Sequence, residues 1–357
     1  MKGIALLTLL LLLSGCIFFE SVTRKGFEED DLTYPLPYYL VMEKKPESNS
    51  ILSPPLIYNL SWQFGKLYSG YKGTVRMEIE NKGKGDIFVY GFSIKIGDEE
   101  QKTKFNYGKK IERGEKENFV FSFDCSLPGE YEYRIGLYLM TGLGNKWYDH
   151  GLRYIDKIGE IEVKDYIKAN YKLHKNYYIY FDKINEMVNP DEKIIREKAS
   201  EIASNYGKNY NIAQVCAIYE WIYENVEYKN DTDDKWTSPS YAILCGGDCE
   251  EFAMLFSAMV NAIGGTTRIY ITDNHAFSSV YIGKNLDLLD SINSYYGSNL
   301  TYAFLEDEFG YWLVADPLSS FYLGGLPVGG VVEEKNNIRY YRWSIVTNEL
   351  YSIDVLR

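Results

Sequence analysis

The chain has 357 residues, of which 46% are hydrophobic and 25% are charged. A chain of this length is expected to form about two domains, and this hydrophobic content lets each bury a core, so a disordered protein is excluded. The formal net charge of −12 argues against nucleic acid or an anionic membrane surface as the main partner.

Residues 1–16 have the layout of a secretory signal, in which Lys2 precedes an apolar run that reaches Leu13. The run is shorter than the roughly 20 residues that span a bilayer, unless it is extended through Phe19. Its end, Leu-Ser-Gly-Cys, also resembles a lipobox, whose cysteine becomes the lipidated first residue of the mature protein. We expect lipidation at Cys16. A plain cleaved signal peptide and a membrane helix are the alternatives, and all three place the rest of the chain outside the cytoplasm.

Two segments of different character follow. Residues 17–58 are polar and contain several prolines, which predicts a tether and an entry strand, not a domain. From 59 to 164 apolar residues alternate with polar ones, for example over 75–79 and 131–139, and turn residues separate the runs. Strands with one wet face each predict an antiparallel sandwich. The stretch resembles an immunoglobulin-like module, and we expect it to act as a spacer.

The pattern changes after residue 164. It predicts three helices and then three strands, at Asn189–Gly207, Ile212–Val226, Cys249–Ile263, Thr267–Thr272, His275–Ile282 and Tyr311–Ala315. Helices first and sheet second describe an α+β domain, which we assign to residues 165–357.

Three residues of this second domain are suited to acyl transfer. Cys249 starts a predicted helix, where the helix dipole favours a thiolate and free backbone N–H groups can hold an oxyanion. His275 begins one predicted strand and Asp316 ends the next, so antiparallel pairing would bring them to the same end of the sheet. Asp316 would then fix the tautomer of His275, which takes the proton of Cys249. Taken singly, each of the three is more often structural.

Together these pieces resemble the transglutaminase-like domain, a relative of the papain-like cysteine proteases. The matching segments are 217–228, 247–255 and the two strands that carry the histidine and the aspartate. The resemblance implies that Cys249 is the nucleophile, His275 the general base and Asp316 its orienting acid. It implies no metal and no organic cofactor.

The segment Gly283–Gly310, between the strands that carry His275 and Asp316, is long for a hairpin. We expect it to cover the site, with Tyr295, Tyr296 and Tyr302 lining a substrate cleft. The alternative is a segment that packs away from the site.

The remaining cysteines are too few to form a disulfide framework. Cys125, Cys216 and Cys245 allow at most one disulfide, and the apolar surroundings of Cys216 predict a buried thiol. The spacing of Cys245 and Cys249 and the positions of the three histidines do not match a zinc site. We expect Cys249 to have a lowered pKa and to be the most reactive thiol.

These features predict an extracytoplasmic, membrane-anchored enzyme that hydrolyses a peptide or related amide through a thioester on Cys249. Transamidation of protein glutamine is the second hypothesis, because cross-linking requires an amine to compete with water in a dry tunnel. A non-catalytic surface module of the same fold is the third. The expected partners are a peptide or protein substrate and the membrane, and no nucleic acid. The substrate, the acyl acceptor and the oligomeric state do not follow from the sequence.

Overall fold

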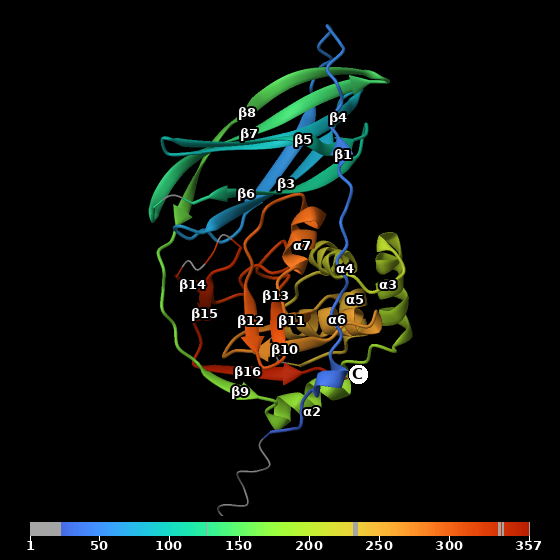
Figure 1. Cartoon of the computed structure of the whole chain (residues 1–357), viewed down its shortest axis with the longest axis vertical. Helices are drawn as coiled ribbons and strands as arrows, with labels where there is room; N and C mark the ends of the chain where they lie inside the picture. The colour runs from blue at the N-terminus through green and yellow to red at the C-terminus, as the bar shows by residue number, and fades with distance from the viewer. Residues whose placement is uncertain (1–22, 126, 231–234, 335–336, 338, 357) are drawn as a thin grey trace, which may run out of the picture.

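The chain folds into two units stacked along the long axis of the molecule (Figure 1). The computed structural model describes residues 23–125, 127–230, 235–334, 337 and 339–356. The predicted lipidation site, Cys16, lies outside these residues. Within them, no helix has the length and apolar character needed to cross a membrane.

The N-terminal unit is strand-rich, and its two sheets share one hydrophobic core. One sheet has the strand order β1-β5-β4-β7-β8 and the other the order β2-β3-β6. The strands are β1 (Glu43–Lys44), β2 (Tyr58–Phe64), β3 (Lys72–Asn81), β4 (Asp86–Ile96), β5 (Glu99–Ile111), β6 (Lys116–Asp124), β7 (Gly129–Leu143) and β8 (Lys146–Val163). In β3 the predicted alternation is observed, since Val75, Met77 and Ile79 are fully buried between more exposed neighbours.

The C-terminal unit has a six-stranded sheet in the order β12-β13-β11-β10-β16-β9 and a separate β14-β15 pair. Its strands are β9 (Lys172–Lys175), β10 (Thr267–Ile271), β11 (Ala276–Gly283), β12 (Phe304–Asp307), β13 (Gly310–Ala315), β14 (Gly330–Glu334), β15 (Arg342–Ile345) and β16 (Glu349–Asp354). The α-helices are α2 (Tyr178–Met187), α3 (Lys193–Ala203), α4 (Ile212–Asn225), α5 (Pro239–Cys245), α6 (Cys249–Ala262) and α7 (Leu288–Tyr296), and the 3-10 helices are η1 (Glu29–Asp31) and η2 (Ser204–Tyr206). Helix α6 packs on β10 and β11, so the helical layer lies directly against the strands that lead into the site.

Local sequence explains where the predicted helices begin and end. Asn211 caps α4 by accepting hydrogen bonds from the backbone N–H groups of Ala213 and Gln214, while the Gln214 side chain accepts from the Asn211 N–H. Gly207, at φ 92° and ψ −177°, has a positive-φ conformation that glycine adopts readily and that stops the preceding helical segment. Both boundaries agree with the sequence prediction to within a few residues.

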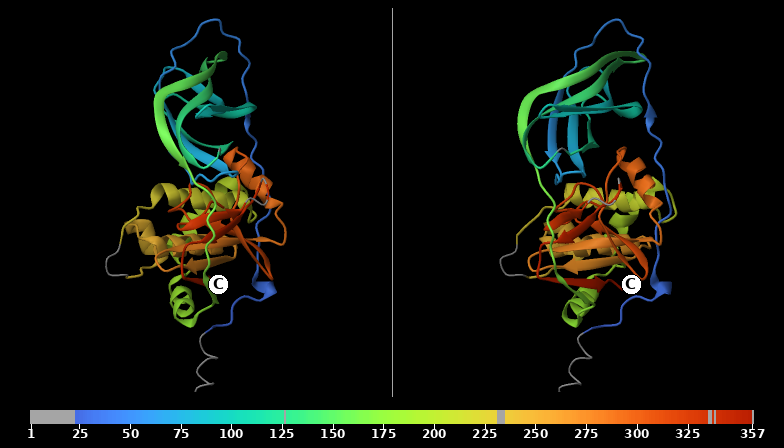
Figure 2. Two further views of the ribbon diagram at one scale, coloured as in Figure 1. Left: turned by 90° about the vertical axis from the view of Figure 1, so that its left-hand side faces the viewer. Right: turned by 60° about the vertical axis from the view of Figure 1, so that its left-hand side comes forward.

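The segment predicted to be a tether is docked along the whole molecule from Thr23 onward, as Figure 2 shows. Leu36 forms a parallel bridge with Asn211 of the C-terminal unit. The backbone N–H of Leu40 donates to Ser294 Oγ at 3.1 Å, and Lys45 pairs with Asp149 of the sandwich at 2.8 Å. These contacts fix the segment to both units, so it is part of the folded structure.

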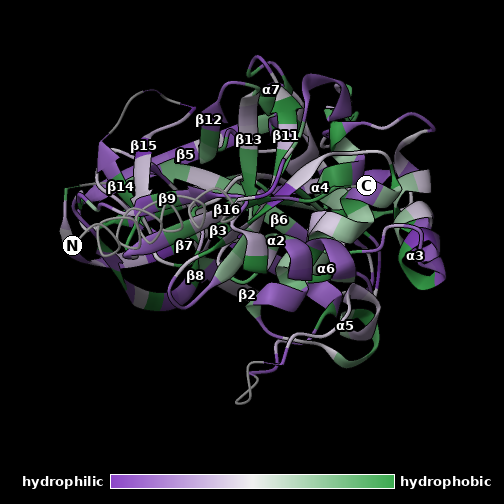
Figure 3. Ribbon diagram, turned by 90° about the horizontal axis from the view of Figure 1, so that it is seen from below, coloured by the Kyte–Doolittle hydropathy of each residue, from purple (hydrophilic) through white to green (hydrophobic). Residues whose placement is uncertain are grey.

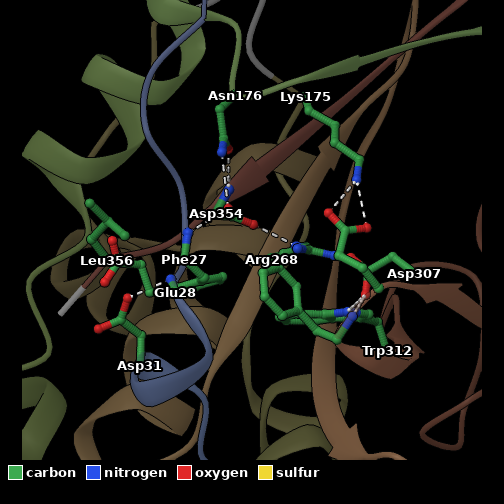
Figure 4. A network of polar contacts seen from close by, with 12 residues as sticks. Phe27, Glu28, Asp31, Lys175, Asn176, Arg268, Asp307, Trp312, Asp354 and Leu356 are labelled. Atoms are coloured by element: carbon green, nitrogen blue, oxygen red, sulfur yellow. Dashed lines mark hydrogen bonds and ion pairs between the residues drawn. The ribbon is translucent and has the colours of Figure 1, made fainter.

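The same segment is tied to the C-terminal strand through a buried ionic network around Arg268 (Figure 4). Arg268 is 5% exposed and bonds Asp354 and Asp307, each at 2.5 Å, and its guanidinium lies 3.7 Å from the centroid of the Trp312 ring. The Asp354 carboxylate also accepts from the backbone N–H of Phe27 at 3.0 Å. A charge buried this deeply requires such paired partners.

The two units also contact each other directly. The Arg76 guanidinium on β3 pairs with the Glu224 carboxylate on α4 and lies 4.6 Å from the centroid of the Tyr223 ring. Asn118 of β6 donates to the same Glu224 carboxylate at 3.0 Å. Val120 of β6 is 7% exposed and belongs to the core of the C-terminal unit. The sandwich therefore packs on α4.

Candidate functional site

The predicted nucleophile lies at the first residue of α6. Gly246 has φ 78°, and a Cβ added there would meet the carbonyl oxygen of Glu227 at 2.3 Å, so only glycine fits. Gly247 then pairs with Tyr228 in a parallel bridge, and its carbonyl accepts from the Lys229 N–H at 2.8 Å. This close approach turns the chain into the start of α6 and leaves Cys249 partly exposed.

Figure 3 views the molecule from the end opposite the sandwich and shows α5 outside α6. Tyr241 and Leu244 of α5 are 50% and 72% exposed, and Tyr228 of the bridge is 52% exposed. Exposed apolar side chains therefore lie on the elements that flank the start of α6.

The predicted base and its partner meet at one end of the sheet, as the strand order requires. β11 and β13 are antiparallel neighbours, with Ser278 opposite Ala315. His275, just before β11, and Asp316, just after β13, are 7% and 2% exposed. Their side chains form a hydrogen bond of 2.9 Å between Nε2 and Oδ2. The neighbouring positions inferred from the two strand patterns are confirmed.

Backbone groups fix the Asp316 carboxylate. Oδ2, which bonds His275, also accepts from the N–H of Val328 at 2.8 Å, and Oδ1 accepts from the N–H of Leu318 at 3.2 Å. A buried carboxyl group with this many donors is held in one orientation. It can therefore hold the imidazole with Nδ1 directed away from it.

Packing of α6 on β11 brings the thiol to the backbone next to His275. Ser278 Oγ donates to the Ala253 carbonyl at 2.7 Å, which joins strand and helix close to their site ends. The Cys249 sulfur interacts with the backbone N–H of Ala276, the residue after His275. Within the described part of the chain, the thiol donates its hydrogen bond not to His275 but to Glu250 Oε2, at 3.3 Å.

Acidic groups surround the thiol. Burial, together with the nearby Glu250 and Asp248 carboxylates, raises the pKa of Cys249 to about 12, although the Ala276 N–H partly offsets the rise. The prediction of a lowered pKa is therefore wrong for this resting structure, because burial and carboxylates outweigh the helix dipole. Burial, with a contribution from Glu250, also raises the pKa of Asp248 to about 6.

The same three residues are the one group among the described residues that could offer metal ligands together. Ligand atoms of Asp248, Cys249 and Glu250 lie within 4.8 Å of one another. A cation bound there would occupy the nucleophile. The other two histidines lie elsewhere: His150 bonds Thr141 at 2.8 Å, and His174 pairs with Glu349.

The segment 283–310 does not present its tyrosines to the site. It forms α7 and β12, and Tyr295, Tyr296 and Tyr302 are 7%, 7% and 0% exposed. Tyr295 donates to Glu220 of α4 at 2.6 Å, and Tyr302 donates to Asn293 within α7 at 2.8 Å. The three tyrosines are therefore part of the packed interior. This favours the alternative, in which the segment packs away from Cys249.

The four cysteines of the described region are free thiols: Cys125, Cys216, Cys245 and Cys249. Cys216 is fully buried, as its surroundings predict. Two residues that the sequence analysis missed are Glu250, beside the thiol, and Val328, on Asp316. The run of acids at 248–251 was a signal for the first, whereas a backbone N–H donated from a later turn leaves no sequence signal.

Comparison with known proteins identifies part of this unit. Residues 196–317, which include Cys249, His275 and Asp316, match the model of the transglutaminase-like superfamily. This region is a transglutaminase-like domain, a relationship that indicates a papain-like cysteine enzyme fold. Among curated proteins, no sequence matches the chain.

Similarities to solved structures are weak. The putative ApaA protein from Bordetella pertussis is 12% identical, with a TM-score of 0.23 over 31% of this chain and 98% of that one. The CARDB domain of a Pyrococcus furiosus protein is 11% identical, with a TM-score of 0.21 over 32% and 95%. The PapD-like domain 7 of human CEP192 is 12% identical, with a TM-score of 0.21 over 37% and 100%. TM-scores this low carry no argument about fold or function.

Proposed function

We propose that the protein is an extracytoplasmic cysteine enzyme that hydrolyses peptide or related amide bonds through a thioester on Cys249. The observation that carries this proposal is the buried hydrogen bond between His275 and Asp316, at 2.9 Å, beside a cysteine at a helix N-terminus. A buried histidine–carboxylate pair next to a partly exposed thiol has the arrangement of a nucleophile, base and orienting acid.

The proposed chemistry follows from the hydrogen bond between His275 and Asp316. Nε2 of His275 is bonded to Asp316, so Nδ1 is the ring nitrogen that receives the thiol proton when Sγ attacks the amide carbon. Backbone N–H groups at the start of α6 stabilise the oxyanion. His275 then protonates the leaving amine, the C–N bond breaks, and a thioester remains. Water, deprotonated by His275, attacks the thioester and releases the acid and the thiol.

Because the resting thiol has a raised pKa, the attack begins from the neutral thiol. Catalytic hydrogen bonds are often long in a free enzyme and tighten when substrate binds. Substrate that displaces the thiol from Glu250 would turn it toward Nδ1.

Hydrolysis is favoured over transamidation because water reaches the site. Cys249 is partly exposed, and Tyr228, which forms the bridge to Gly247 just before it, is 52% exposed. Cross-linking requires an environment in which an amine outcompetes water for the thioester. Transamidation of protein glutamine is therefore the second candidate.

We also propose an outward-facing location, with an anchor at Cys16 and the strand-rich unit as an immunoglobulin-like module. The support is the signal-like sequence of residues 1–16 and the strand alternation of residues 59–164. Mass spectrometry of the mature N-terminus tests the anchor. Recovery of unprocessed Met1 would remove the lipoprotein hypothesis.

The reaction is tested with a glutamine-containing peptide, with and without a primary amine, using wild type and Cys249→Ala. The proposal expects hydrolysed product from wild type in both mixtures and none from Cys249→Ala. Stable amine incorporation with no hydrolysis would reverse the order of the two reactions. No product from any peptide, together with an unreactive Cys249, would favour a non-catalytic module.

A further inference from the structure

The sandwich sends one loop into the sheet that carries the site. This loop, residues 65–71 between β2 and β3, buries Leu67, Tyr68 and Tyr71, which are 5%, 3% and 7% exposed. Tyr68 and Tyr71 share a hydrophobic cluster with Phe277 of β11 and Val314 of β13. These are the strands that lead to His275 and Asp316, so the loop packs on the support of the catalytic pair.

A polar contact runs from the same loop to Asp316. The Lys66 ammonium donates a hydrogen bond to the carbonyl oxygen of Pro327. The next residue, Val328, donates its backbone N–H to Asp316 Oδ2 at 2.8 Å, and this oxygen also accepts from His275 Nε2 at 2.9 Å. Lys66 and the histidine are thus connected through one turn and one carboxylate oxygen.

The turn is also held by contacts other than Lys66. The Pro327 carbonyl accepts from the Gly330 N–H at 2.9 Å, which closes the turn, and Leu326, just before it, packs in the same hydrophobic cluster as Tyr68 of the loop. The hydrogen bond from Lys66 is made to the Pro327–Val328 peptide group itself. Such a contact determines where the Val328 N–H lies.

The surroundings of Lys66 both disfavour and stabilise its positive charge. Burial, with a contribution from the nearby Lys164, lowers its pKa to about 8, and Asp316 acts in the opposite direction. A partly buried ammonium is stabilised here by a carbonyl oxygen and by the Asp316 carboxylate. A flexible surface lysine would gain neither.

We propose that Lys66 is a positioning residue, through which the sandwich holds the Pro327–Val328 turn and thereby the orientation of Asp316 toward His275. The inference rests on the proposed function, because it assigns the sandwich a role in the chemistry of the same site. The strand-rich unit is then part of the enzyme and not a spacer alone.

The test compares Lys66→Met with Lys66→Arg and with Lys164→Met in the full-length protein. Lys66→Met keeps the length of the side chain and removes the donor, Lys66→Arg keeps the donor and the charge, and Lys164→Met removes a neighbouring charge that does not bond Pro327. We expect Lys66→Met to lower kcat about tenfold to a hundredfold with less than a twofold change in KM, since misplacement of a supporting group slows the chemical step. Arginine should restore most of the rate, and Lys164→Met should behave as wild type.

A spectroscopic readout separates this inference from the proposed function. The chain has three histidines, so the proton on His275 Nε2 can be assigned by comparison with His275→Asn. Its downfield resonance should be sharp in wild type and in Lys164→Met, and shifted upfield or exchange-broadened in Lys66→Met. This result would support positioning even if no substrate were turned over.

An unchanged resonance and an unchanged kcat in folded Lys66→Met would overturn the inference. If Lys66→Met unfolds below the assay temperature, the comparison of Lys66→Arg with Lys66→Gln tests the inference instead. Both retain a donor but only arginine retains the charge and reach, so equal activity and equal His275 resonances in these two variants would also overturn it.

Discussion

The site has two halves, the His275–Asp316 pair and the acidic start of α6 around Cys249. They differ in how their carboxylates are hydrogen-bonded. On one side, the Asp316 carboxylate accepts hydrogen bonds from His275, Val328 and Leu318, so each of its oxygens has a partner. On the other side, Asp248 Oδ1 is buried without a hydrogen-bond partner, and the Glu250 carboxylate accepts from the thiol. In the proposed mechanism the first half is preorganised for proton transfer, whereas the second half keeps the Cys249 thiol protonated until substrate displaces it from Glu250.

This difference suggests how the Cys249 thiol of such a site remains protonated in the absence of substrate. A cysteine at a helix N-terminus is ordinarily acidified by the dipole. Here Asp248 caps α6 and Glu250, which is 7% exposed, lies in its first turn, and both carboxylates raise the pKa of Cys249. In the proposed mechanism the histidine–aspartate pair is the base, and these two acids determine when the thiol gives up its proton.

The largest effect is expected from breaking the preorganised half. Asp316→Asn keeps the size of the side chain but cannot accept at both oxygens, so His275 is no longer held in the required tautomer. We expect kcat to fall by about 10³–10⁴, the range seen when triad carboxylates are replaced. Steady-state kinetics measure it, with Asp165→Asn, an exposed acid, as the control. A loss below tenfold would mean that Asp316 is a turn former only.

A smaller effect of opposite sign is expected in the acidic half. Glu250→Gln removes the carboxylate that bonds the thiol, so the pKa of Cys249 should fall. A fall of about one unit would speed alkylation of Cys249 at pH 7 about tenfold. Glu227→Gln is the matched control, because the Glu227 side chain pairs with Lys229 and is 75% exposed. Equal alkylation rates in the two variants would contradict the acidic restraint.

The pH dependence of alkylation checks the same restraint in the wild type. A thiol with its pKa raised to about 12 exposes little thiolate at neutral pH, so the rate should rise about tenfold per pH unit from pH 7 to pH 9 without a plateau. A plateau beginning below about pH 8.5, the ordinary thiol value, would indicate a thiolate stabilised by the helix end. The rate constant for reaction with iodoacetamide, followed by mass spectrometry of Cys249, measures it.

The smallest effect concerns stability. The folded pKa of Asp248, about 6, lies above the ordinary value of 3.8, so the native state binds more protons between these values and its stability falls as pH rises through this window. Asp248→Asn keeps a good helix N-cap and should stabilise the protein by about 1 kcal/mol at pH 7 and by nothing near pH 3. Urea unfolding at both pH values measures the difference, with Asp287→Asn at another N-cap as control. A stabilisation that is equal at both pH values would contradict the assignment.

Short-range patterns predicted most of the elements that build the site. The helices at α3, α4 and α6 and the strands at β10, β11 and β13 follow from periodicity and capping, and the meeting of His275 with Asp316 follows from strand order. What could not be predicted depends on contacts between distant segments. Lys66 sits in a Gly-Lys-Leu turn that resembles any surface loop, and its partner Pro327 lies 261 residues later.

The docking of the N-terminal segment has the same explanation. Its prolines and polar residues predict a tether, yet Leu36 and Leu40 find partners in the C-terminal unit that no local pattern reveals. Likewise, Tyr295 and Tyr296 look like cleft residues in sequence, and only the packing of α7 on α4 shows that they are core residues. The prediction of a lowered pKa for Cys249 was wrong because it considered the helix dipole but not burial or the neighbouring Glu250 and Asp248 carboxylates.

An electrophilic peptide probe tests whether Cys249 is the nucleophile that the His275–Asp316 pair activates. Cys245 is an internal control, because it is also a free, partly exposed thiol four residues away. We expect the probe to label Cys249 well ahead of Cys245, and His275→Ala to abolish this preference. Equal labelling of the two cysteines, unchanged by His275→Ala, would contradict this role of Cys249.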